Sequence, residues 1–96
     1  MIKDMFPELK WKYTQDKQIE QILDEVDELK VEVKNKDRER TLYEAIDVMY
    51  STATFLYISN FSEEEIDKGL EYVRQKNKDR GYLHKADGED VTYRKR

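Results

Sequence analysis

The chain of 96 residues has no cysteine, one proline and three glycines. Without cysteine it has no disulfide framework and no thiol chemistry. So few turn-forming residues leave little room for tight β-hairpins, and both glycine-rich phosphate-loop motifs are absent. No apolar run approaches the ~20 residues that a membrane-spanning helix needs. These absences favour an all-α protein outside the membrane.

The chain has many charged residues, and its positive and negative charges nearly cancel. Charged residues make up 42% of the chain, and the net charge is −4. No basic stripe dominates, which argues against a nucleic-acid partner. The first twelve residues lack the apolar core of a secretory signal. We therefore expect one small cytoplasmic domain, with a core over residues 15–83 and a polar tail over residues 84–96.

Two stretches carry clear amphipathic helix patterns with caps. Residues 15–33 follow a candidate N-cap, Thr14, and repeat apolar residues at intervals of three and four. The other stretch begins after Ser62, which forms a capping box with Glu65, and runs to about residue 79. Gly81 then stands where a C-terminal glycine ends a helix. Both stretches are predicted to be helices with one apolar stripe.

The stretch between them, from residue 37 or 38 to residue 59, is apolar nearly all round. Between Thr41 and Phe61, Glu44 and Asp47 are the only charged residues. Such a helix is a buried one, and three helices of this length cannot bury it alone. The sequence thus predicts an antiparallel bundle of three main helices, completed by homo-oligomerisation. Tyrosines at seven-residue spacing are the candidates for the contact: Tyr43, Tyr50 and Tyr57.

Four carboxylates form two pairs, each with a spacing of three residues: Glu25 with Glu28, and Glu44 with Asp47. That spacing places both members of a pair on one helical face. Two such helices side by side bring four oxygen-rich groups together, which is how Mg²⁺ is bound. Solvated faces paired with lysine are the alternative, but they fit Glu44 and Asp47 poorly in an otherwise apolar helix.

The order ExxE, fifteen residues, then ExxD resembles the signature of the MazG-like all-α nucleoside triphosphate pyrophosphohydrolases. Residues 24–29 resemble the family's EExxEL, and residues 43–48 its ExxDV helix. Residues 76–82 are similar to its closing Asn-x-x-Arg-Gly. Asp24 departs from the pattern, because the family has a second glutamate there. The resemblance covers residues 15–83.

This resemblance implies an enzyme that cleaves a nucleoside triphosphate between its α and β phosphates, with Mg²⁺ or alternatively Mn²⁺, as a dimer or tetramer. It implies metal ligands at Glu25, Glu28, Glu44 and Asp47. Glu28 or Glu25 is the expected catalytic group that orients the attacking water. The expected substrate contacts are Asn77, Arg80 and Lys76 for phosphates, and Trp11 and Tyr50 for the base.

Two alternatives stay open. The related phosphoribosyl-ATP pyrophosphohydrolases share the carboxylate helices, but they carry a lysine before the glutamates and a histidine after the ExxD turn. Here Gln21 and Ile22 precede the acids, and Tyr50 and Ser51 follow them. The second alternative is a non-catalytic helical interaction protein whose acids form only salt bridges.

Overall fold

The computed structural model describes residues 2–9 and 13–83, and its regular structure there is entirely helical. The helices are α1 (Ile2–Met5), α2 (Gln15–Lys34), α3 (Arg38–Ile58) and α4 (Glu63–Asp79). The all-α class is thereby confirmed, and the three long helices lie where the sequence predicts them. The predictions for Trp11 and for the 84–96 tail fall outside the described residues. None of the described helices is both long and apolar enough to cross a lipid bilayer.

Each long helix begins at a side-chain cap. The Thr14 hydroxyl accepts a hydrogen bond from the Lys17 N–H at 3.2 Å. The Asp37 carboxylate accepts one from the Arg40 N–H at 3.0 Å. Ser62 caps α4 in the predicted capping box. These caps satisfy backbone donors that the first helical turn leaves without a partner, so the short polar connections suffice to start each helix.

The three long helices also end alike, with a residue in the left-handed conformation. These residues are Lys36 (φ 56°), Asn60 (φ 66°) and Gly81 (φ 72°). After α2, the Lys36 N–H donates to the Val33 carbonyl at 3.1 Å and the Asp37 N–H to the Glu32 carbonyl at 3.2 Å. This bond pair is the Schellman motif, and it recurs after α3 and α4. The chain therefore reverses sharply after α2, and α3 returns antiparallel to it.

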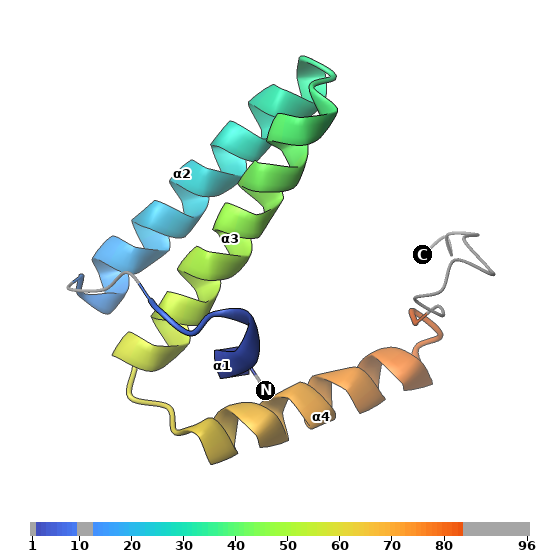
Figure 1. The fold of residues 1–96 in the computed structure, drawn as a ribbon. Coiled ribbons are helices and arrows are strands. Elements are labelled where there is room, and N and C mark those ends of the chain that lie inside the picture. The colour runs from blue at the N-terminus through green and yellow to red at the C-terminus, as the bar shows by residue number, and fades with distance from the viewer. Residues whose placement is uncertain (1, 10–12, 84–96) are drawn as a thin grey trace.

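The antiparallel pair of α2 and α3 provides the main helix–helix contact in the described part of the chain. Figure 1 shows α4 leaving the far end of α3 and running away from this pair, while α1 lies between α3 and the start of α4. The buried apolar side chains are few: Phe6, Ala53 and Ile66. One chain therefore forms a helical hairpin with a projecting helix, and the expected three-helix bundle stays a prediction for an assembly of chains.

We expect the replacement Lys36→Gly to stabilise the fold by about 1 kcal/mol. A side chain in the left-handed region crowds its own backbone, and glycine removes that strain at some cost in chain entropy. Urea unfolding would measure the difference. The matched control is Lys34→Gly at the last residue of α2, where glycine should instead destabilise by about 0.5–1 kcal/mol. Equal effects of the two replacements would contradict this account of the turn.

Candidate metal centre

Three of the predicted carboxylates meet in the structure. One oxygen each of Glu25, Glu28 and Glu44 lies within 4.8 Å of the other two. Glu25 and Glu28 are one turn apart on α2, and the antiparallel return of α3 places Glu44 opposite them. Asp47, one turn further along α3, is not part of this group of three but hydrogen-bonds with Glu44. Three of the four paired carboxylates thus converge on one point between two helices.

The three carboxylates differ in exposure. Glu25 retains only 8% of its accessible surface, Glu44 is half-buried and Glu28 is exposed. Gln18 and Glu25, two turns apart on α2, are the buried residues of that helix, so α2 turns this face toward α3. The cluster is therefore closed on the Glu25 side and open to solvent on the Glu28 side.

Glu44 is the electrostatically strained member of the cluster. Burial raises the pKa of its carboxyl above the usual 4.5, and neighbouring acids raise it further: Glu28, Asp47 and Glu32. The hydrogen bond with Asp47 acts in the same direction, because it needs a proton between the two carboxyls. The Glu44 Oε1 atom is buried and accepts no hydrogen bond from any donor among the described residues.

This donor set suits a hard divalent cation. Carboxylate oxygens are the preferred ligands of Mg²⁺ and Mn²⁺, and three of them converge here from two rigid helices. A cation at this point would offset the mutual repulsion of the acids that raises the pKa of Glu44. Glu25, Glu28 and Glu44 are therefore the residues that would hold such an ion, with Asp47 next to them.

A buried polar contact holds the two helices in register beside the cluster. The Gln18 amide, almost fully buried on α2, donates to the Ser51 carbonyl on α3 at 2.9 Å. Ser51 is itself buried at this contact, whereas the buried Thr54 lines a hollow together with Phe6, Leu9 and other residues of the N-terminal segment. Sequence reasoning did not single out Gln18, although its place two turns before Glu25 on the same face would have indicated it.

The predicted substrate contacts are not gathered around the cluster within one chain. Lys76 and Asn77 lie in the last turn of α4, and Arg80 caps it; that end of α4 stands apart from α2 and α3 (Figure 1). Tyr50 packs edge-to-face on Phe6, with ring centroids 4.6 Å apart. These substrate contacts stay predictions, and the α4 residues would need another chain to bring them to the acids.

Two residues near the cluster were given no functional role by the sequence. Glu32, taken singly as a solvated acid, is close enough to raise the pKa of Glu44. Arg40 lines a hollow of about 380 Å³ together with Glu39, Tyr43 and Glu44. The spacing of four between Arg40 and Glu44 was visible in the sequence and places both on one face of α3.

Comparisons with protein-family models, with curated proteins and with solved structures found no match to this chain. A functional assignment must therefore be argued from the side chains of the site itself.

We expect Glu44→Gln to raise the melting temperature of the metal-free protein at pH 7. A raised pKa in the fold means that ionised Glu44 costs stability at neutral pH, and that this cost disappears as the pH falls through the raised pKa toward 4.5. The variant should thus exceed the wild type most at pH 7 and converge with it near pH 4.5. Thermal unfolding in chelator, followed by circular dichroism across this range, measures the difference.

The control for this experiment is Glu20→Gln, because Glu20 is an exposed acid on the same helix as Glu25. It should leave the melting temperature nearly unchanged at every pH. If Glu44→Gln lowered the melting temperature at pH 7, the electrostatic description of the cluster would be wrong.

Proposed function

We propose that this protein is a divalent-metal-dependent nucleoside triphosphate pyrophosphohydrolase, similar to the MazG-like enzymes, that releases a nucleoside monophosphate and pyrophosphate. The observation that carries this proposal is the convergence of carboxylate oxygens from Glu25, Glu28 and Glu44 between two helices. Glu44 also has a buried oxygen, Oε1, that accepts no hydrogen bond from the described residues. A site this acidic repels a triphosphate unless a cation reverses the local charge. The ion we propose is Mg²⁺, with Mn²⁺ as the alternative.

The proposed role of each carboxylate follows from its exposure to solvent. Glu25 and Glu44 are enclosed between the helices and hold the ion. When bound, the ion polarises the phosphoanhydride and neutralises developing charge. Glu28 is open to solvent, so its free oxygen can orient a water for attack on phosphorus and accept its proton. Asp47 lies next to Glu44 on α3 and adds a further negative charge beside the ion.

We further propose that the active form is a homo-oligomer. The α2–α3 hairpin exposes large apolar side chains that a single chain leaves in water: Ile19, Leu23, Val33, Leu42, Ile46 and Met49. At about 100° per residue they share one side of the hairpin, away from the carboxylates. Leu70 and Val73 on α4 are exposed as well. A second chain that covers these faces would complete a helical bundle and could bring the basic end of α4 to the acids.

The same apolar faces also suit the second candidate, a non-catalytic helical interaction protein. That candidate explains the exposed leucines and isoleucines but gives no role to the buried Glu44 oxygen. The two candidates differ in one measurable respect. A protein whose acids serve only salt bridges gains no thermal stability from divalent metal, whereas a native-state metal site does.

We predict that the purified protein releases pyrophosphate from at least one nucleoside triphosphate, and that release requires Mg²⁺ or Mn²⁺. Glu44→Gln and Asp47→Asn should each lower turnover at least ~100-fold, since each removes a charge at the ion. The measurement is a screen of common and modified triphosphates for pyrophosphate, repeated with chelator. Glu20→Gln serves as the control and should retain full activity.

Metal binding is checked separately from turnover. Added Mg²⁺ or Mn²⁺ should raise the melting temperature of the wild type and of Glu20→Gln, but not that of Glu44→Gln. If neither ion shifted the wild-type melting temperature and no triphosphate were cleaved, the enzyme assignment would be wrong and the interaction-protein reading would remain.

We also predict that Leu42→Glu shifts the wild-type oligomer to monomer. Leu42 is 56% exposed in one chain, so a charge there should spare the chain's own packing while it disrupts a contact with a second chain. Light scattering after size exclusion measures the mass. The control is Tyr72→Glu, at a 70% exposed residue opposite the apolar stripe of α4, which should leave the mass unchanged. A monomeric wild type would refute the association.

A further inference from the structure

The hollow beside the carboxylate cluster contains a cation from the same helix. Arg40 and Tyr43 line it together with Glu44, which also belongs to the cluster, and the hollow measures about 380 Å³. Arg40 precedes Glu44 by four residues, so the two side chains leave adjacent turns of α3 on one face. A group bound to Glu44 that extends into this hollow therefore has the Arg40 guanidinium as a neighbour.

The structure leaves the Arg40 side chain available for a ligand. Its ion pair with Asp37 spans 3.7 Å, and both side chains are largely open to solvent (69% and 42% accessible). The role of Arg40 at the start of α3 falls to its backbone, whose N–H donates to the Asp37 cap. Replacing the side chain therefore leaves the cap intact, which makes Arg40 suited to a mutational test.

We propose that Arg40 is a substrate-positioning residue that binds the phosphate chain of a metal-bound polyphosphate held at Glu25, Glu28 and Glu44. This inference rests on the proposed function and names the phosphate-binding group within the same chain. A guanidinium offers a planar pair of donors that matches two phosphate oxygens, and it cannot lose its charge at working pH. Next to three acids, it provides the positive charge that the outer phosphates of the chain require.

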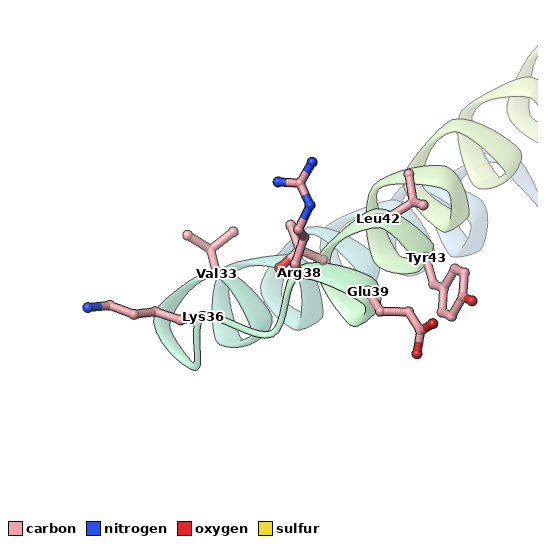
Figure 2. Close-up of a pocket in the computed structure, with 7 residues that line it drawn as sticks. Val33, Lys36, Arg38, Glu39, Leu42 and Tyr43 are labelled. Carbon is pink, nitrogen blue, oxygen red and sulfur yellow. The ribbon is translucent and has the colours of Figure 1, made fainter.

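The other arginine at the start of α3 is not placed for this role. Figure 2 shows Arg38 on the same side as Val33 and Leu42, pointing away from Tyr43 and Glu39. Arg38 lines the neighbouring hollow of about 770 Å³, whose lining does not include Glu44. Arg38 and Arg40 thus carry the same charge two residues apart but face different surfaces, which makes Arg38 a matched control.

The test measures binding of magnesium tripolyphosphate, a probe with phosphates but no base, by isothermal titration calorimetry on the full chain. Arg40→Ala should weaken binding roughly ten- to a hundredfold, the range expected for loss of a charge-assisted contact. Arg40→Lys should recover part of the loss, because it keeps the charge but not the paired donors. Arg38→Ala, with the same change in net charge, should bind within about twofold of the wild type.

A titration with Mn²⁺ alone separates this inference from the function on which it rests. Arg40→Ala should bind Mn²⁺ as the wild type does, because Arg40 does not contribute a ligand to the ion. If the wild type binds Mn²⁺ but Arg40→Ala binds tripolyphosphate equally well, or Arg38→Ala loses as much, the role of Arg40 is overturned while the metal centre stands. If the wild type binds neither Mn²⁺ nor tripolyphosphate, both the centre and the role of Arg40 are rejected.

Discussion

The seam between α2 and α3 buries polar groups where a helical hairpin would ordinarily bury apolar ones. Gln18, Glu25, Ser51 and Thr54 are the buried polar residues of the described chain. The Gln18 amide and the Thr54 hydroxyl each donate a hydrogen bond to a backbone carbonyl of α3, at 2.9 Å in both cases. The buried Oε1 atom of Glu44 has no hydrogen-bond donor among the described residues, and ionised acids cannot donate to one another. The seam thus fixes the helices in register and places a group of acids between them.

The most buried positions and the exposed surface are unusual in their polarity. Polar residues take four of the seven buried positions of the described chain, whereas large apolar residues such as Leu23, Leu42 and Met49 lie exposed on the hairpin. Exposed apolar faces of this extent mark surfaces that bind other proteins. The proposed homo-oligomer would bury these faces against a copy of the chain. The buried polar residues and the exposed apolar faces are therefore two aspects of the same packing.

Local features of the fold could be predicted from the sequence because they depend on a few neighbouring residues. The Thr14 and Ser62 caps, the extents of the long helices and the turn at Gly81 are of this kind. The course of α4 could not be predicted, because an apolar stripe does not say whether its partner lies in the same chain or in another. The left-handed conformation of Lys36 could not be predicted either, because it is glycine, and not lysine, that favours this conformation.

Some features of the candidate site could be predicted from the sequence in the same way, and others could not. Helical spacing placed Glu25 beside Glu28, and the short turn after α2 placed Glu44 opposite them, so the convergence of these three could be predicted. The burial of Glu25, the proximity of Glu32 and the place of Arg40 depend on the rotation of each helix about its axis. In the structure this rotation brings Gln18 against the Ser51 carbonyl, a contact between polar residues that apolar stripes do not indicate.

A proton and a divalent cation compete for the same role in this cluster. Both relieve the repulsion among Glu28, Asp47 and Glu44 that raises the pKa of Glu44. The proton does so by neutralising one carboxyl, whereas a cation keeps every carboxyl ionised and uses its oxygens as ligands. In the proposed metal centre, acidification would favour the proton over the cation, so metal binding should weaken as the pH falls toward the usual carboxyl pKa.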